Sequence, residues 1–119
     1  MKALIIAAHG SRKKESNLEV AALVARLSQK VKGKFDIIEF AFLQMAEPLL
    51  ETRLAQLAQT GVKQLVIFPL FIASGSHITM DIPQLVQKAR DAYPEMDIRV
   101  TVHLGKIPAI EDVIIREVS

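Results

Sequence analysis

The chain has 119 residues, half of them hydrophobic and 24% charged, and this size and balance predict a single domain spanning residues 1–119. It contains no cysteine, which excludes disulfides, thiolate metal sites and cysteine nucleophiles and favours a cytoplasmic protein. No apolar run approaches the roughly 20 residues that cross a bilayer. The apolar run at residues 3–8 is too short for a signal peptide, so we expect no membrane association.

The net charge of +2 is unevenly distributed. Residues 1–34 hold eight Lys or Arg and two Glu, a balance of +6, whereas the remainder holds seven basic and eleven acidic residues. The basic excess is either a solvated helix face or a surface that attracts an anionic ligand. Because this segment has no aromatic residue before Phe35 and no DNA-reading motif, we expect no nucleic-acid partner.

Apolar runs alternate with helical patterns in the first half of the chain. Residues 3–8, ALIIAA, form an uninterrupted apolar run, which predicts a strand buried on both faces as in a parallel sheet. Residues 15–32 carry apolar side chains at helical spacing. Residues 35–43 predict a second strand. A second helix follows, with Pro48 in its first turn and Gly61 at its end.

The same alternation continues into the second half. Residues 63–72 predict a third strand, which Pro69 should bend or end because proline cannot donate a ladder hydrogen bond. Asp81 is typical of a helix N-cap, with Pro83 in the first turn of the helix that follows. We expect Pro94 to stop this third helix.

A fourth strand is expected at residues 97–103 and a last helix from Pro108. The predicted order is therefore βαβαβαβα. Crossovers of this length indicate an α/β fold in which a four-stranded parallel sheet carries flanking helices. Four strands make a small sheet for a doubly wound fold, and a second copy of the chain would supply the missing half.

Two histidines follow predicted strands. His9 comes directly after the first strand, and His77 comes five residues after the third. Ligands of open parallel sheets bind beyond the C-terminal strand ends, and the first and third strands are neighbours in the usual order. The two imidazoles are therefore candidates for one site, where helix N-termini add positive potential. The alternative is that both are loop residues beside glycines and serines that serve turns and caps. His103 lacks the small-residue setting, and we interpret it as structural.

Three kinds of chemistry suit a crevice with two histidines. Neutral imidazoles bind Co²⁺, Fe²⁺, Ni²⁺ or Zn²⁺. Phosphoryl transfer through a histidine nucleophile is disfavoured, because Ala8 stands where phosphohistidine phosphatases carry the arginine that clamps phosphate. Nucleotide binding is disfavoured as well, because the chain has neither a G-x-G-x-x-G loop nor a Walker A motif.

Four stretches that cover nearly the whole chain carry a family resemblance. They are AAHGSR after the first strand, AFLQMAEPLL, VIFPLFIASGSHITMDIP, and LG after the fourth strand. In this order they resemble the small CbiX-type sirohydrochlorin chelatases. The resemblance implies a flavodoxin-like half-fold and an ATP-independent class II chelatase without organic cofactor, which inserts Co²⁺ or Fe²⁺ into sirohydrochlorin for cobalamin or sirohaem synthesis. It also implies a homodimer in which two short chains reproduce the halves of larger chelatases.

The resemblance assigns catalysis and metal binding to His9 and His77. Where the family has a Phe-Leu-Glu pattern, this chain ends the pattern with Gln44, a neutral amide in place of a carboxylate. Gln44 or Glu47 is then the candidate for a further metal ligand, although Glu47 equally suits a carboxylate that stabilises a helix N-terminus. The substitution at Gln44 keeps open a second hypothesis, a non-catalytic carrier or partner subunit that binds metal or tetrapyrrole.

The substrate implied by the resemblance is a tetrapyrrole rich in carboxylates. The basic N-terminal third of the chain suits such a ligand. The candidate substrate-binding residues flank the two histidines: Gly10, Ser11, Arg12, Gly75 and Ser76.

Overall fold

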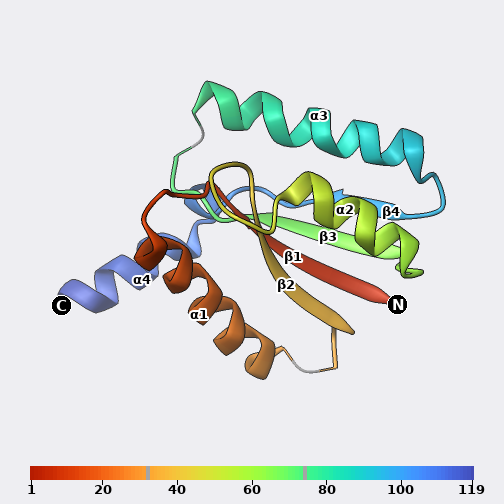
Figure 1. The fold of residues 1–119 in the computed structure, drawn as a ribbon. Coiled ribbons are helices and arrows are strands. Elements are labelled where there is room, and N and C mark those ends of the chain that lie inside the picture. Colours follow the sequence, from red (N-terminus) through yellow and green to blue (C-terminus); the bar gives the residue numbers. More distant parts are fainter. Residues whose placement is uncertain (32, 74) are drawn as a thin grey trace.

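The computed structural model describes residues 1–31, 33–73 and 75–119, and residues 76–80 by their backbone alone. One parallel sheet runs through it in the order β2-β1-β3-β4 (Figure 1). This arrangement confirms the predicted fold class and the predicted neighbourhood of the first and third strands. The strands are β1 (Lys2–Ala8), β2 (Ile37–Phe42), β3 (Gln64–Pro69) and β4 (Asp97–Val100).

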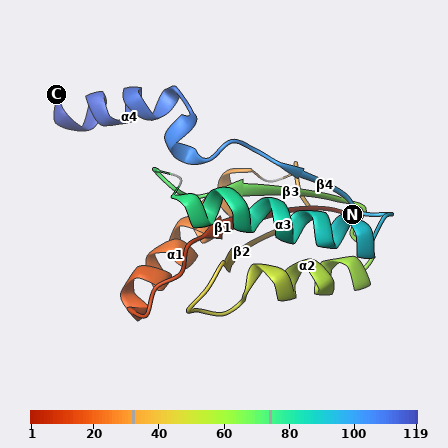
Figure 2. The ribbon, with the colours of Figure 1, turned by 90° about the horizontal axis from the view of Figure 1, so that it is seen from above.

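Helices alternate with the strands in the predicted βαβαβαβα order. The helices α2 and α3 lie on one face of the sheet and α1 lies on the other, whereas α4 extends away from the body of the molecule (Figures 1 and 2). No helix within the described residues is long and apolar enough to cross a bilayer. The helices are α1 (Lys14–Lys30), α2 (Leu50–Gln59), α3 (Ser76–Ala92) and α4 (Ala109–Val118), with a 3-10 turn, η1 (Leu104–Lys106), between β4 and α4.

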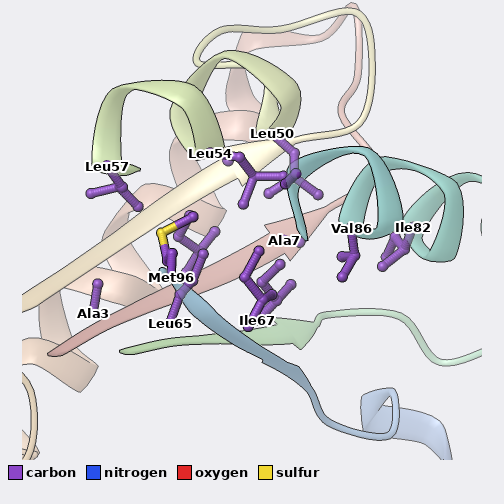
Figure 3. Close-up of a cluster of buried hydrophobic side chains, with 14 of the residues drawn as sticks. Ala3, Ala7, Leu50, Leu54, Leu57, Leu65, Ile67, Ile82, Val86 and Met96 are labelled. Carbon is purple, nitrogen blue, oxygen red and sulfur yellow. The ribbon is translucent and has the colours of Figure 1, made fainter. Parts of the chain in front are cut away.

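The core forms where α2 and α3 pack onto the sheet, as Figure 3 shows. β1 runs through its centre: Ala3 and Ile5 face this cluster with no exposed area, while Ile6 faces the opposite side and is 3% exposed. The prediction that this strand is buried on both faces is therefore confirmed. The cluster comprises Ala3, Ile5, Ala7, Ala41, Leu50, Leu54, Leu57, Val62, Leu65, Ile67, Phe71, Ile82, Val86, Ala89, Met96 and Ile98.

The boundaries around β3 and α2 test three predictions. β3 ends at Pro69, as expected for a residue without a backbone N–H. Gly61 follows the end of α2 with φ +87°, the left-handed conformation typical of a residue just past a helix. The prediction for Pro48 is wrong. It lies two residues before Leu50, and its carbonyl accepts a hydrogen bond from the N–H of Phe42 at 2.8 Å, so it joins α2 to the end of β2.

Two further boundaries differ from the predictions. α3 begins at Ser76 rather than near Asp81. Pro83 therefore lies inside the helix and not in its first turn as predicted. β4 ends at Val100 rather than residue 103. Its only neighbour, β3, ends at Pro69, so β4 loses its pairing partner soon after Val100. The predicted helix at residues 15–32 corresponds to α1, but residue 32 itself lies outside the described residues.

The C-terminal helix α4 has no buried residue. Val113, Ile114, Ile115 and Val118 are each more than half exposed, and Ile114 and Val118, four residues apart, centre an apolar stripe that Val113 borders. The radius of gyration is 14.5 Å. A compact chain of this length would have about 13.5 Å. The excess is consistent with the projection of α4 seen in Figure 2, and the helix presents apolar surface to the surroundings of the molecule.

Candidate functional site

The loops that follow β1 and β2 are joined at the C-terminal edge of the sheet. The N–H of Leu43 donates to the carbonyl of Ala8 at 3.0 Å, and the N–H of Gln44 donates to the carbonyl of His9 at 3.2 Å. These bonds continue the pairing of the two strands beyond their last residues. They place His9 beside Gln44, although 35 positions separate the two residues in the sequence.

Gly10 permits this close approach. Its φ is +96°, a conformation that side chains rarely adopt, and a Cβ atom built on it would lie 1.8 Å from the carbonyl oxygen of Gln44. Only glycine fits at this point without moving one of the two loops. Gly10 therefore does more than serve a turn, because it also makes the contact across to Gln44.

A second glycine joins the loops after β3 and β4. The N–H of Gly105 donates to the carbonyl of Phe71 at 2.9 Å, and a Cβ atom on Gly105 would lie 1.6 Å from the carbonyl oxygen of Ile72. This contact gives a physical reason for the LG stretch after the fourth strand. The carbonyl of His103, just before η1, accepts a hydrogen bond from the N–H of Lys106 at 3.0 Å. This contact belongs to the backbone, and the structural interpretation of the His103 side chain stays a prediction.

The imidazole of His9 is exposed and has neighbours on two sides. The side-chain amide nitrogen of Gln44 lies 3.4 Å from Nδ1 of His9. The ring of Phe71 meets the imidazole edge to face, with ring centres 6.1 Å apart and planes at 70°. Phe71 was not among the predicted site residues, and its only signal in the sequence is that the apolar run continues past Pro69.

His77 and Ser76 begin α3, and their side chains lie outside the described residues. Because β3 is hydrogen-bonded to β1, the loop after β3 leaves the sheet at the same edge as His9. Gly75 precedes α3 as its N-cap residue, is exposed, and has an ordinary φ of −73°. The backbone topology thus brings the two predicted loops to one edge, and the convergence of the two imidazoles stays a prediction.

Ser11 shapes the entry into α1. Its N–H donates to Oδ1 of Asn17 at 3.1 Å, and Nδ2 of Asn17 donates back to the carbonyl of Ser11 at 2.8 Å. The hydroxyl of Ser11 accepts a hydrogen bond from the N–H of Lys13 at 3.1 Å. Sequence reasoning missed Asn17, because an isolated asparagine on a helix gives no signal of a contact to a loop. Arg12 and Lys13 are exposed beside the hydrogen bonds between Ser11 and Asn17, and they make this edge of the sheet basic.

Glu47 is exposed and lies three residues before the start of α2 at Leu50. Among the residues whose side chains are described, no three histidine, aspartate or glutamate residues form a group that could hold a metal ion. A role for Gln44 or Glu47 as metal ligand therefore stays a prediction, and the observed partner of His9 is the amide of Gln44.

A groove of about 520 Å³ lies elsewhere, at the outer edge of β2 between α1 and α2. Its lining includes apolar residues such as Val24 and Phe40 and the ion pair between Arg53 and Glu39. His9 is not part of this lining. We assign the candidate site to the sheet edge, because the C-terminal ends of parallel strands are where such folds bind ligands.

The comparisons with known proteins bear on the family of the chain. The family model described as CbiX matches residues 3–119. The chain is 32% identical over 111 residues to the chloroplastic sirohydrochlorin ferrochelatase of Arabidopsis thaliana, an alignment that covers 93% of this chain and 48% of the relative. These names favour the chelatase hypothesis over the carrier hypothesis.

Two solved structures are similar along almost the whole chain. A CbiX protein of cobalamin biosynthesis from Marinobacter aquaeolei has a TM-score of 0.75 and 27% identity, covering 99% of this chain and 98% of that chain. The sirohydrochlorin chelatase SirB from Bacillus subtilis subspecies spizizenii, solved in complex with cobalt, has a TM-score of 0.84 and 25% identity, covering 98% of this chain and 49% of that chain. The present chain thus spans about half the length of both SirB and the plant relative.

We expect Gly10→Ala to lower the free energy of unfolding much more than Gly61→Ala. Both glycines have positive φ, +96° and +87°, so both substitutions carry the same backbone strain. This strain costs about 1 kcal/mol. A Cβ atom meets nothing within 4 Å at Gly61 but collides with a carbonyl at Gly10. We expect a loss of at least about 3 kcal/mol for Gly10→Ala, measured by urea denaturation. Equal losses for the two variants would contradict the close approach of the loops.

Proposed function

We propose that this chain, which belongs to the CbiX family, inserts a divalent metal ion into sirohydrochlorin without ATP. The observation that carries the proposal is that the family match spans residues 3–119 and that an exposed histidine, His9, stands at the ligand-binding edge of the sheet. Fe²⁺ and Co²⁺ are the favoured substrates, because one relative is named a ferrochelatase and a structural neighbour holds cobalt. Ni²⁺ and Zn²⁺ are further candidates, since imidazole also binds them.

The reaction exchanges ligands and protons. The incoming metal ion is held by His9 and His77, then passes to the nitrogens of the macrocycle, which releases both pyrrole protons. Neutral imidazoles suit this task, because they hold first-row metal ions and accept protons. The proposed reaction changes no oxidation state, so it needs no organic cofactor. We propose that residues 1–119 act as one domain and, since the chain lacks cysteine, in the cytoplasm.

The carboxylates of the substrate would meet the basic loop after β1. Arg12 is exposed there, beside Lys13 and Lys14. Ser11 uses its hydroxyl oxygen as an acceptor from Lys13, which leaves the hydroxyl hydrogen free to donate to a carboxylate. At the same sheet edge, Gly75 is the N-cap residue of α3 and Ser76 is its first residue, and helix N-termini favour anions. Gly10 contributes by letting the loop after β2 come close to the loop that carries His9.

We also propose that the chain works as a homodimer. A tetrapyrrole is too wide to be enclosed by the edge of one four-stranded sheet, and good small-molecule sites cover most of their ligand. The chain matches 49% of SirB, so a second copy would supply an equivalent half. The apolar stripe of α4 offers a surface for that contact, because Val113, Ile114 and Val118 are exposed. The symmetric arrangement of two copies is the common form of such contacts.

The activity test follows the absorbance of sirohydrochlorin under anaerobic conditions after Co²⁺ or Fe²⁺ is added. We expect the native chain to accelerate insertion above the spontaneous rate, and His9→Ala to lower this acceleration at least about tenfold. His103→Ala is the matched control, because His103 lacks the small-residue setting of His9 and His77, and it should retain the native rate. A native rate equal to the spontaneous one would refute the proposed activity.

Metal binding tests whether His9 and His77 form one site. We expect each single alanine variant to lose most of the Co²⁺ binding of the native chain, because two ligands on separate loops gain affinity by acting together. The double variant should then add little to the worse single variant, as expected for residues that share one ligand. Isothermal titration of the metal into the four proteins measures this. Independent, additive losses would show that the histidines do not converge.

Light scattering tests the homodimer. The native chain should show about twice its 13.2 kDa mass at micromolar concentration. Ile114→Glu should produce monomers, because a charge on the apolar stripe of α4 cannot be buried in the contact without a large cost. Leu18→Glu on α1 is the control, since Leu18 is 65% exposed and lies outside α4. A dimer that survives Ile114→Glu would exclude α4 as its contact.

A further inference from the structure

We propose that Gln44 is a positioning residue for His9. In this assignment the side-chain carbonyl oxygen of Gln44 accepts a hydrogen bond from Nδ1–H of His9, so that Nε2 keeps its lone pair for the metal ion. The inference rests on the proposed function, because it takes His9 as a residue that holds the metal. It gives the amide of Gln44 a task other than that of a ligand.

The contact between the two side chains is the first support. The side-chain amide nitrogen of Gln44 lies 3.4 Å from Nδ1 of His9, the ring nitrogen nearer the backbone, and the proposal takes the amide in its other orientation, with the oxygen toward Nδ1. A half-turn about the last side-chain bond presents either the NH₂ group or the carbonyl oxygen to Nδ1. If the NH₂ group donates, the neutral ring carries its proton on Nε2, and that nitrogen cannot bind metal. If the oxygen accepts, the proton stays on Nδ1 and Nε2 is free.

The backbone holds the pair in register, which is the second support. The N–H of Gln44 donates to the carbonyl of His9 at 3.2 Å, and Gly10 lets the carbonyl of Gln44 approach within a distance that a Cβ atom would forbid. Both ends of the interaction are therefore fixed by main-chain contacts. Because the backbones are already fixed, a hydrogen bond between the two side chains requires only a small further loss of conformational entropy.

The ring of Phe71 is the third support. It meets the imidazole of His9 edge to face at 6.1 Å between ring centres, and Phe71 itself is only 7% exposed. The buried ring restricts how the imidazole tilts, and the amide of Gln44 then selects which nitrogen carries the proton. Histidines that bind metal ordinarily donate their other N–H to such a partner, which raises the basicity of the ligating nitrogen.

The amide supplies this hydrogen bond without adding charge. A carboxylate at the same place would also accept from Nδ1–H, but its negative charge would strengthen the attraction for a cation. Gln44 therefore orients His9 while leaving the affinity for metal moderate. A chelatase needs this balance, because the metal ion must leave the protein for the macrocycle.

The decisive experiment measures the tautomer of His9 in the metal-free protein. Long-range ¹H–¹⁵N spectra at a pH of about 8, where imidazoles are mostly neutral, distinguish Nδ1–H from Nε2–H. The three histidines of the chain are assigned by comparison with single alanine variants. We expect the native His9 to carry its proton on Nδ1, Gln44→Ala to shift it to Nε2, and Gln44→Glu to restore Nδ1–H. Gln87→Ala, an exposed glutamine on α3, should change nothing.

Metal titration completes the test. We expect Gln44→Ala to weaken Co²⁺ binding about tenfold, the usual loss when the partner of a ligating histidine is removed. Gln44→Glu should bind Co²⁺ at least as tightly as the native chain. A native His9 protonated on Nε2, or a Gln44→Ala variant with native tautomer and native affinity, would overturn the positioning role. Failure of the proposed function would look different: His9→Ala would bind Co²⁺ normally, or the native chain would not insert metal, whatever the tautomer.

Discussion

The close approach of the loop after β1 to the loop after β2 is the constraint on which the site depends. It exists because Gly10 lacks a Cβ atom that would lie 1.8 Å from the carbonyl oxygen of Gln44. The contact extends the pairing of two parallel strands by two residues and carries it out of the core into the site. At the same edge of the sheet, between the loops after β3 and β4, Gly105 lies against the carbonyl of Ile72 in the same manner. Both pairs of neighbouring loops are thus joined by main-chain contacts, which set the spacing of their backbones.

The joined loops limit the freedom of the side chains that they carry. His9 and Gln44 are both exposed, and exposed side chains ordinarily keep much of their rotational freedom. Here the strand pairing sets the separation of their backbones, and Phe71 restricts the imidazole ring. Arg12 and its lysine neighbours are exposed beside this pair, where their positive charge would attract the carboxylates of the proposed substrate.

The parts of this fold that follow from local chemistry were predictable from the sequence. An unbroken apolar run identified β1 as a doubly buried strand, and Pro69 identified the end of β3, because each feature acts on its own backbone. The start of α3 was not predictable, because a proline at the eighth position of a helix looks the same as one in the first turn. The contacts of His9 with Gln44 and Phe71 depend on strand order and register, which join distant residues and leave no local pattern.

The helix α4 connects the fold to its proposed assembly. Apolar side chains such as Val113 and Ile114 gain about 1.5–3 kcal/mol each when they leave water, and in a single copy they remain largely exposed. The four-stranded sheet cannot recover this energy alone, because α2 and α3 already cover the face that carries the main core. Burial of α4 against a second copy would gain this free energy and would bring another sheet edge near the first. The two sheet edges brought together in this way would enclose the proposed substrate. The exposed stripe of α4 would then serve the proposed activity as well as the stability of the dimer.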